Sequence, residues 1–383
     1  MVTLTRAGRQ YSRQPTLETR PHREGATAYP VYVSIRDTRG RSIDCPHRKG
    51  KDMTPRPSQI AIIIPYFQRE AGLLRQCVGS ILAQPGNIDF HIVVVDDGSP
   101  VPAASELEPL QAQAKTQLQV VLQTNAGPGA ARNTGLDHVP EGTRFVTFMD
   151  SDDQWTGPFL DDAVHALEQG SDLFIGNSTR AGQEATRFEW GADKHLNLKP
   201  GDHRVVDVER DIHLFQGDFF DMLVRRSNLI GPTTFAYRFE RFPHVRFDPS
   251  IYNGQDRLFK LTLGQDLKTV AFSPKVYAFE GEGVNIFDKS QWGSEGSVRL
   301  SASYIRLSRT ILSSIRLNPA QRAFVEGQLA EARYALVANV LHLLKRRTRV
   351  DWSLVVAAFK EDPKSVALLP SHLWHILLKR SQT

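Results

Sequence analysis

The sequence predicts an α/β protein in which a mostly parallel sheet is flanked by helices and followed by a helical C-terminal region. Two short apolar runs, at residues 60–65 and 90–95, suit strands that are buried on both faces. Between them, apolar residues at three- and four-residue spacing over 70–83 predict an amphipathic helix, so that strand, helix and strand form a right-handed crossover unit. From residue 297 onward the apolar spacing is helical almost to the end of the chain.

The remaining elements follow in order along the chain. We expect a helix over 103–114, a strand over 118–123, a helix starting within 127–132 and a strand over 144–149. A helix near 159–169 and a strand at 172–176 extend the sheet, and the aperiodic stretch to about residue 212 predicts an insertion. This part ends with a helix at 217–224, a strand near 234–237 and a helix at 255–264.

Composition and cysteine usage exclude several classes of protein. The 383 residues are 40% hydrophobic and 23% charged, which is typical of a globular chain. Cys45 and Cys77 lack the spacing of a disulfide framework or a thiolate zinc site. Without a signal-like apolar region or a run of about 18 apolar residues, we expect a cytoplasmic protein that is neither exported nor inserted in a membrane.

Both ends of the chain are basic and its middle is acidic. Residues 1–58 hold 12 Lys and Arg against 5 Asp and Glu, residues 59–344 hold 27 against 34, and residues 345–383 hold 8 against 3. The basic segments lack a nucleic-acid motif or interleaved aromatic residues, so no nucleic-acid partner is expected. Anionic lipid is an alternative partner. We interpret residues 1–58 as a basic, poorly structured extension with one strand-like run at 29–35.

Three carboxylates follow one of the buried strands within four positions. Asp150, Asp152 and Asp153 repel each other unless a cation lies among them, and hard divalent ions prefer oxygen ligands. Magnesium or manganese held in this way keeps positions open for phosphate oxygens, so a nucleotide diphosphate is the predicted partner. The alternative interpretation is a solvated turn that caps the next helix.

Two further polar segments lie at predicted strand ends. Asp96 and Asp97 precede Gly98 and Ser99, a pattern in which one carboxylate can bind a base or ribose. The glycine-rich segment Asn125–Asn133 allows close approach to a ligand and includes Arg132, which can pair with a phosphate. The chain lacks the endings of a Walker loop and the Gly-x-Gly-x-x-Gly fingerprint, which disfavours a nicotinamide dehydrogenase.

Together these segments resemble the inverting family 2 glycosyltransferases, which share the nucleotide-diphospho-sugar transferase (GT-A) fold. The resemblance covers residues 60 to about 285 and rests on Ile62–Phe67, Val94–Ser99, Gly129–Gly135, Phe148–Trp155 and Gly254–Phe259. It implies a catalytic domain over 59–296, with a nucleotide-binding half at 59–156 and an acceptor half at 157–296, followed by a helical region at 297–383.

The resemblance also implies roles for individual residues. Asp152 and Asp153 would hold the divalent metal, and Asp256 would be the general base that deprotonates the acceptor. The donor nucleotide would contact Pro65, Phe67, Asp97, Arg132 and Asp150. A single displacement at the anomeric carbon would invert its configuration.

The chain departs from the family pattern at two places. Gln255 stands where glutamate is usual, which leaves the base in place and changes its neighbour's charge. The segment Ala278–Asn285 lacks the basic or histidine-containing lid of many relatives, and Arg238 or Arg257 could supply that charge.

Within the family, the chain looks most similar to enzymes of bacterial exopolysaccharide assembly, including succinoglycan-type glucosyltransferases. That narrower resemblance implies UDP-glucose as donor and an oligosaccharide on a polyprenyl diphosphate as acceptor. The apolar and basic residues at 373–380 and 345–347 suit peripheral contact with an anionic membrane, or else these helices pack on the catalytic domain. The competing interpretations are a sugar nucleotidyltransferase and a non-catalytic sugar-nucleotide-binding or membrane-assembly partner.

Overall fold

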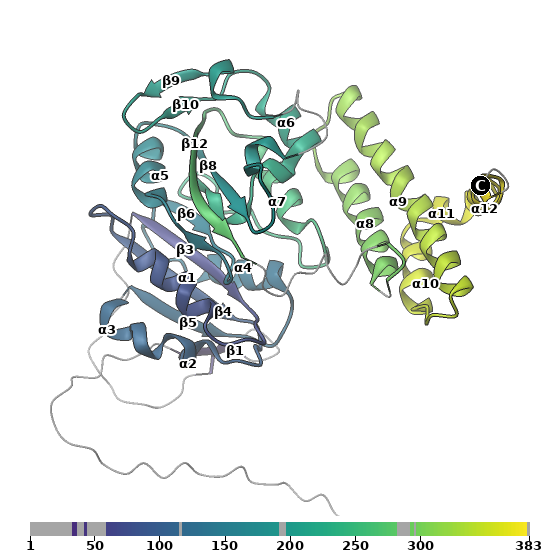
Figure 1. Ribbon diagram of the computed structural model, residues 1–383, viewed down its shortest axis with the longest axis horizontal. Helices are drawn as coiled ribbons and strands as arrows, with labels where there is room; N and C mark the ends of the chain where they lie inside the picture. The colour runs from purple at the N-terminus through teal and green to yellow at the C-terminus, as the bar shows by residue number, and fades with distance from the viewer. Residues whose placement is uncertain are drawn as a thin grey trace, which may run out of the picture.

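The computed structural model describes residues 33–36, 42–43, 59–114, 117–190, 197–281, 292–294 and 296–380. Its strands are β1 (Val33–Arg36), β2 (Ser42–Ile43), β3 (Ile60–Tyr66), β4 (Phe90–Asp96), β5 (Leu118–Leu122), β6 (Phe145–Phe148), β7 (Gln154–Trp155), β8 (Leu173–Arg180), β9 (Arg204–Asp207), β10 (Ile212–Leu214), β11 (Phe235–Arg238) and β12 (Val270–Glu280). Within the described residues they form one sheet in the order β2-β1-β5-β4-β3-β6-β11-β8-β12-β10-β9, and β7 pairs with β12 (Figure 1).

Helices cover both faces of this sheet. They are α1 (Leu73–Leu82), α2 (Ala103–Leu107), α3 (Gln111–Ala114), α4 (Pro128–Asp137), α5 (Phe159–Glu168), α6 (Phe219–Arg226), α7 (Gln255–Gly264), α8 (Ser297–Ser314), α9 (Pro319–Lys345), α10 (Trp352–Glu361), α11 (Pro363–Ala367) and α12 (Leu369–Arg380). Buried residues of α1, α2 and α5 form the core on one face, and those of α4, α6, α7, α8 and α9 form the core on the other. This arrangement confirms the predicted α/β class with a C-terminal helical region.

Strand β3 shows why its sequence is continuously apolar. Ile60, Ile62 and Ile64 pack into one core, whereas Ala61 and Ile63 pack into the other. Successive side chains of a strand point to opposite faces, so a strand covered on both sides has no polar position. Gly135 on α4 lets that helix approach closely, because a Cβ atom there would lie 2.3 Å from Ile63 Cγ2.

The strand order brings three strand ends together at one edge. Strands β1, β5, β4, β3 and β6 run parallel, and β11 pairs antiparallel with both β6 and β8. The chain moves outward from β3 to β4 and β5, and then returns to place β6 on the other side of β3. Ligands of open α/β sheets bind at such a point, outside the carboxyl ends of the strands.

Strand β12 is the longest of the strands that the sequence pattern did not predict, the others being β2, β7, β9 and β10. Its eleven residues pair with β8, and the register shifts between Phe272 and Val276, around Pro274. A bulge of this kind interrupts the alternation of apolar residues by which a strand is recognised. Because β12 ends at Glu280, it delivers Gly281 to the same edge as the ends of β3, β4 and β6.

The basic N-terminal segment contributes to the sheet. Strand β1 pairs with β5 and overlaps the predicted strand-like run, and β2 pairs with β1. The segment therefore adds two strands to the sheet beyond β5, although residues 1–58 were predicted to form a poorly structured extension. The rest of residues 1–58 lies outside the described residues.

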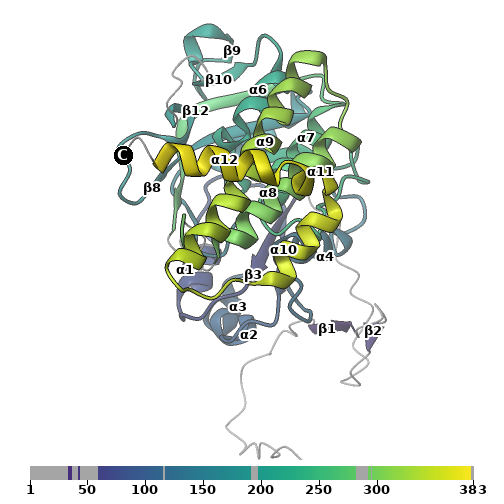
Figure 2. The ribbon, with the colours of Figure 1, turned by 90° about the vertical axis from the view of Figure 1, so that its right-hand side faces the viewer.

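The C-terminal helices stand to one side of the sheet (Figures 1 and 2). Leu307 and Ile311 of α8 and Val325 of α9 join the main core of the sheet, whereas α10 packs with α8 and α9 around a separate small core. The buried carboxylate of Asp362 ties these helices together through bonds from Arg333 Nε at 2.6 Å and Arg309 Nη1 at 2.8 Å. Among the described residues, no helix has both the length and the apolar character needed to cross a bilayer.

Candidate active site

The ends of β3, β4 and β6 are cross-linked by Gln68. Its backbone N–H donates to Ser99 Oγ at 2.9 Å, and its side-chain Nε2 donates to Ser151 Oγ at 3.1 Å. Ser99 follows β4 and Ser151 follows β6, so one buried glutamine holds both polar turns against the end of β3. The sequence analysis did not identify Gln68, since nothing in its neighbourhood distinguishes it from an exposed polar residue.

The Asp96–Asp97 pair positions backbone. Asp96 accepts hydrogen bonds from the N–H groups of Ser99 and Ala103, both at 2.8 Å. Asp97 accepts from Gln123 Nε2 at 2.6 Å and from the N–H groups of Ala126 at 2.7 Å and Gly127 at 2.8 Å. The buried Asp97 therefore holds the loop that leads into α4. Phe67, which directly follows β3, is half-buried. Contact of Pro65, Phe67 and Asp97 with a nucleoside stays a prediction.

Arg132 connects the start of α4 to the acidic turn. Its Nη2 donates to Asp150 Oδ1 at 2.5 Å, and its guanidinium carbon lies 5.4 Å from the centre of the Phe247 ring. The side chain is buried, and its Nε atom has no hydrogen-bond partner within the described part of the chain. A buried guanidinium with a spare donor is suited to binding an anion such as a phosphate.

The three aspartates after β6 have different surroundings. Asp153 is buried and accepts hydrogen bonds from Thr233 Oγ1 and from Gly281 N at 2.9 Å. Asp150 and Asp152 are half-buried. Burial, together with the charges of Asp150 and Asp152, raises the pKa of Asp153 well above its usual range. Thr233 Oγ1 also accepts from the N–H of Asp150 at 3.2 Å, so this threonine organises the turn.

Gly281 allows the chain after β12 to touch this turn. A Cβ atom on Gly281 would lie 2.1 Å from the backbone oxygen of Asp152, far inside any real contact. Thr233 and Gly281 were both missed by the sequence analysis, because they lie 80 and 128 positions from Asp153 along the chain. Of the predicted lid at 278–285, residues 282–285 fall outside the described residues.

The donor set of the turn suits a hard divalent cation. Carboxylate oxygens are the preferred ligands of Mg²⁺ and Mn²⁺, and a cation would offset the repulsion from Asp150 and Asp152 that adds to burial in raising the pKa of Asp153. Across the described ranges, however, no three His, Cys, Asp or Glu side chains are grouped closely enough to hold a metal ion by themselves. Since Mg²⁺ is usually bound by one or two carboxylates plus substrate phosphates, the fit is to a cation shared with the donor.

Asp256 lies in the first turn of α7, within reach of the charge of Arg132. Its carboxylate Oδ2 accepts a hydrogen bond from Lys260 Nζ at 3.0 Å, and its side chain keeps 35% of its exposure. Burial raises the pKa of Asp256, but the charges of Lys260 and Arg132 and the Lys260 hydrogen bond outweigh it, so the pKa is lowered. Asp256 is therefore ionised at neutral pH, as a general base must be.

Gln255, the departure from the family pattern, is buried against the start of α4. A Cβ atom on Gly129 would lie 2.9 Å from Gln255 Oε1, so the glutamine packs on the glycine-rich segment. A glutamate here would place a second charge in a buried position beside Asp256.

Neither arginine suggested as a substitute for the lid is placed for that role. Arg238 pairs in register with Phe145, at the beginning of β6, which is the opposite edge of the sheet. Arg257 Nη2 donates to Val224 O at 2.9 Å and to Gln328 Oε1 at 2.7 Å, so its guanidinium joins α7 to α6 and α9. The suggestion that either supplies a lid charge is wrong for these structural reasons.

Comparison with known proteins gives the following relatives. Residues 61–229 match the family model described as Glycosyl transferase family 2. The succinoglycan biosynthesis protein ExoW of Rhizobium meliloti is 28% identical over 311 residues, covering 81% of this chain and 96% of that protein. The GalNAc(5)-diNAcBac-PP-undecaprenol beta-1,3-glucosyltransferase of Campylobacter jejuni is 22% identical and is covered over 76% of its length, by 68% of this chain.

Two solved structures superpose on large parts of the chain. Residues 1–349 of S. aureus TarS in complex with UDP-GlcNAc give a TM-score of 0.48 at 18% identity, over 75% of this chain and 73% of that one. The mannosyltransferase PcManGT from Pyrobaculum calidifontis, in complex with GDP-Man and Mn²⁺, gives 0.46 at 16% identity, over 85% and 86%. The family-model match includes Asp97, Arg132 and the acidic turn, and it ends before α7 and Asp256.

Proposed function

We propose that this chain, which matches the Glycosyl transferase family 2 model over residues 61–229, is a family 2 glycosyltransferase with the GT-A fold that transfers glucose from UDP-glucose to a growing, lipid-linked oligosaccharide in the biosynthesis of a bacterial polysaccharide. The observation that carries the chemistry is the convergence on Arg132: it bonds Asp150 of the acidic turn, and its charge reaches Asp256 on α7. A candidate donor-binding group and a candidate base thus both interact with one buried arginine.

The donor and acceptor are proposed from the relatives. The Campylobacter jejuni protein is named as a glucosyltransferase that acts on an undecaprenol-linked glycan, and the Rhizobium meliloti protein is named for succinoglycan biosynthesis. The proposal takes its glucosyl donor and its lipid-linked acceptor from the first of these names.

The acidic turn would hold the donor diphosphate through a divalent metal, Mn²⁺ or Mg²⁺, on Asp152 and Asp153. Such an ion, when bound, neutralises negative charge on the departing nucleotide diphosphate. Arg132 would add its own positive charge beside Asp150, in a buried position where an ionic hydrogen bond is strong. Thr233 and the Gly281 N–H hold the Asp153 carboxylate in place while the donor binds.

Asp256 would accept the proton of the acceptor hydroxyl. Its lowered pKa keeps it in the ionised form that can take a proton, and its partial exposure keeps it accessible to the acceptor. The hydroxyl oxygen attacks the anomeric carbon as the bond to the diphosphate breaks, so one displacement inverts an α-linked donor into a β-linked product. No covalent enzyme intermediate is needed.

Metal-dependent nucleotide binding tests this proposal. We expect calorimetric titration with UDP to show binding that requires Mn²⁺, and Asp152→Ala to weaken it by about tenfold or more, since a ligand of the shared cation is lost. Asp137→Ala is the matched control, because Asp137 is an accessible aspartate paired with Arg246 on the surface. If no nucleoside diphosphate binds under any metal condition, the donor assignment fails, and a non-catalytic assembly partner becomes the alternative.

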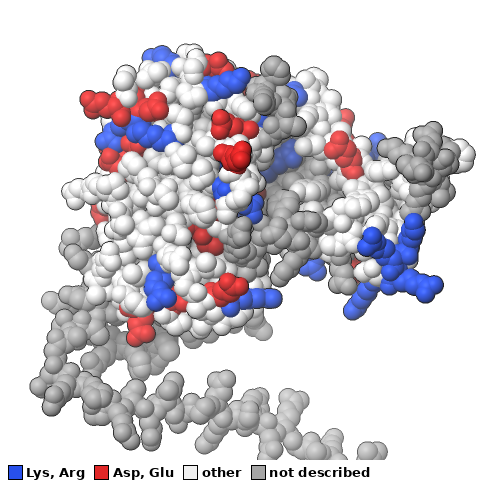
Figure 3. All heavy atoms as spheres, viewed as in Figure 1, with Lys and Arg blue, Asp and Glu red and all other residues white. Residues whose placement is uncertain are grey.

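The outer C-terminal helices support the proposed contact with an anionic membrane. Exposed apolar side chains gather there, with Trp352 at 54%, Val356 at 48% and Trp374 at 64% exposed. The adjoining segment 345–349 carries four Lys and Arg residues, and Figure 3 shows basic side chains gathered on this part of the molecule. Interfacial aromatic residues beside basic ones are typical of peripheral membrane attachment.

Vesicle binding tests the membrane contact. We expect the protein to sediment with phosphatidylglycerol vesicles but not with phosphatidylcholine vesicles. A Trp352→Ser/Trp374→Ser variant should bind about fivefold or more weakly, because it loses apolar area that would be buried in the bilayer. The control is Val206→Ser/Val208→Ser, which removes two exposed apolar side chains, one within β9 and one directly after it. Strand β9 lies at the end of the sheet and is not part of the C-terminal helices. Equal sedimentation of both variants would exclude the helices as the docking surface.

A further inference from the structure

Lys260 is a buried lysine whose ammonium group is fully hydrogen-bonded. Its side chain is 5% exposed, and Nζ donates to the backbone oxygens of Ser227 at 2.8 Å and Ile230 at 2.6 Å and to Asp256 Oδ2 at 3.0 Å. An ammonium has three N–H donors and no acceptor, so these three bonds use its entire capacity. The geometry suits the charged form, since a neutral amine would leave one of the acceptors without a donor.

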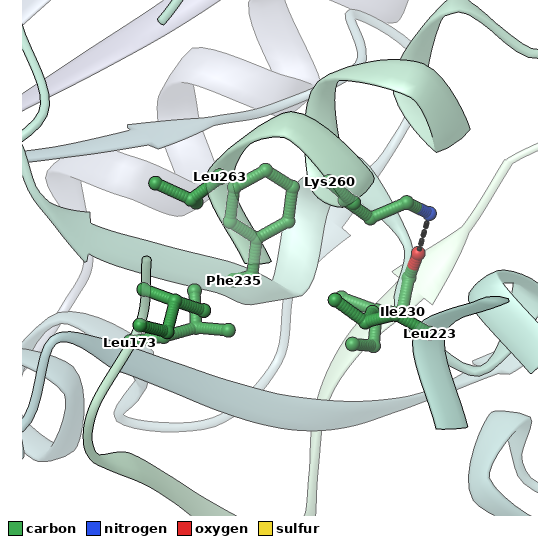
Figure 4. A pocket seen from close by; sticks show the side chains of 7 residues that line it. Leu173, Leu223, Ile230, Phe235, Lys260 and Leu263 are labelled. Carbon is green, nitrogen blue, oxygen red and sulfur yellow. Dashed lines mark hydrogen bonds between the residues drawn. The ribbon is translucent and has the colours of Figure 1, made fainter. Parts of the chain in front are cut away.

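Packing alone does not explain a lysine at this position. Its stem lines a small apolar pocket beneath α7, and Figure 4 shows the ammonium at the rim of this pocket, bonded to Ile230 O. The other residues of the lining are all apolar: Leu173, Leu223, Ile230, Phe235, Leu263 and Leu267. A leucine or methionine would fill the same space without the cost of burying a charge. The charge therefore serves a partner, and the partner with the opposite charge is Asp256.

Several charged groups surround the Asp256 carboxylate, and Lys260 is the one that donates a hydrogen bond to it from its side chain. The titratable groups that act on Asp256 are Lys260 and Arg257 on α7, Arg132 on α4 and Tyr304 on α8. The Arg132 guanidinium bonds Asp150, and the Arg257 guanidinium bonds Val224 and Gln328. Arg187 acts on Lys260 through its charge, and is itself paired with Glu280.

The turn that accepts from Lys260 is part of the fold's rigid core. Residues 227–230 follow α6, and Leu229 and Ile230 are buried in the main core of the sheet. Lys260 thus connects the carboxylate of Asp256 to two backbone oxygens whose positions are set by core packing. A carboxylate held in this way keeps one orientation, whereas a partly exposed carboxylate without such a partner can adopt several rotamers.

We propose that Lys260 is a positioning residue for Asp256, which anchors Oδ2 to the 227–230 turn and keeps the carboxylate ionised and oriented toward the acceptor hydroxyl. This inference rests on the proposed role of Asp256 as general base. During transfer the acceptor proton moves to Asp256, and Lys260 keeps its own protons throughout. Lys260 touches neither donor nor acceptor.

A double-mutant cycle in unfolding tests the anchoring without any substrate. Urea unfolding is measured for the wild type, Lys260→Met, Asp256→Asn and the double variant. We expect the effect of the double variant on the unfolding equilibrium constant to differ by about fivefold or more from the product of the two single effects. The reason is that Lys260→Met leaves a charged Asp256 without its partner, whereas the double variant does not. A cycle that is additive within about twofold overturns the anchoring.

The pH dependence of turnover tests the positioning role. With UDP-glucose and Mn²⁺ as the probe, we expect Lys260→Met to release UDP about tenfold more slowly, with the affinity for UDP unchanged. Loss of the positive charge raises the pKa of Asp256, so the base stays protonated to a higher pH, and the acid limb of the rate profile moves up by about one pH unit. A merely structural role would not move this limb.

Lys275→Met is the matched control for both measurements. Lys275 Nζ lies 3.3 Å from Asp162 Oδ2 in another lysine–aspartate pair, on β12 and away from α7, so its loss should leave the acid limb in place. An acid limb unchanged in folded Lys260→Met overturns the positioning role. If the cycle shows coupling but Asp256→Asn releases UDP at the wild-type rate, the proposed role of Asp256 as the base is refuted instead. The anchoring would then exist without a catalytic consequence.

Discussion

Asp256→Asn is expected to lower the rate of UDP release from UDP-glucose by about 10²- to 10⁴-fold, the range that general base catalysis contributes. Asparagine has nearly the same shape and can still accept the hydrogen bond from Lys260, but it cannot take up a proton from the acceptor or from water. The affinity for UDP should stay within about twofold of the wild type, since the donor is held by other residues. Steady-state kinetics beside calorimetric titration separates these two quantities.

Asp266→Asn supplies the control for this change. Asp266 follows the same helix, is 58% exposed and pairs with Arg316 on the surface, so its variant should keep wild-type kinetics. An Asp256→Asn enzyme that keeps more than about a tenth of the wild-type rate would contradict the assignment, because a lost general base costs more than that. Its unfolding midpoint must be measured as well, because the substitution leaves the charge of buried Lys260 without a counter-charge.

Gly281→Ala should disrupt the acidic turn. The new Cβ atom would lie 2.1 Å from the backbone oxygen of Asp152, and a backbone atom cannot yield as a flexible side chain can. Either the turn or the chain after β12 has to shift, and the hydrogen bond from Gly281 N to Asp153 is lost with it. We expect metal-dependent UDP binding to weaken by about tenfold or more, with a loss of about 1–3 kcal/mol in the free energy of unfolding.

Gly79→Ala is the matched glycine control. Gly79 lies within α1, and a Cβ atom there would meet nothing within 4 Å. Alanine in a helix interior is favoured over glycine by about 0.5–1 kcal/mol, so this variant should be as stable as the wild type or more so, and should bind UDP normally. Wild-type UDP binding by Gly281→Ala would show that the close approach of Gly281 is unimportant for the donor site.

The fold was largely predictable because its strands are covered on both faces. Largely apolar runs at 60–65 and 90–95, separated by an amphipathic helix, leave few alternatives to a parallel sheet. The predicted helix over 103–114 is divided in the structure into α2, a turn of 3₁₀ helix and α3, since Pro109 interrupts it. Strand β12 escaped prediction because the bulge around Pro274 removes the alternation on which a strand is recognised.

The sequence by itself determined which strands are buried, the fold family, and which acidic and basic residues are candidates for the site, because these depend on patterns a few positions long. The residue partners depended on tertiary structure: Gln68 meets Ser151 across 83 positions, and Gly281 meets Asp153 across 128. A polar residue looks the same in a sequence whether its partner is water or a distant carboxylate. Only the packing of α7 against the 227–230 turn shows that Lys260 is buried and bound to Asp256, while the roles of the site residues remain predictions for these variants to test.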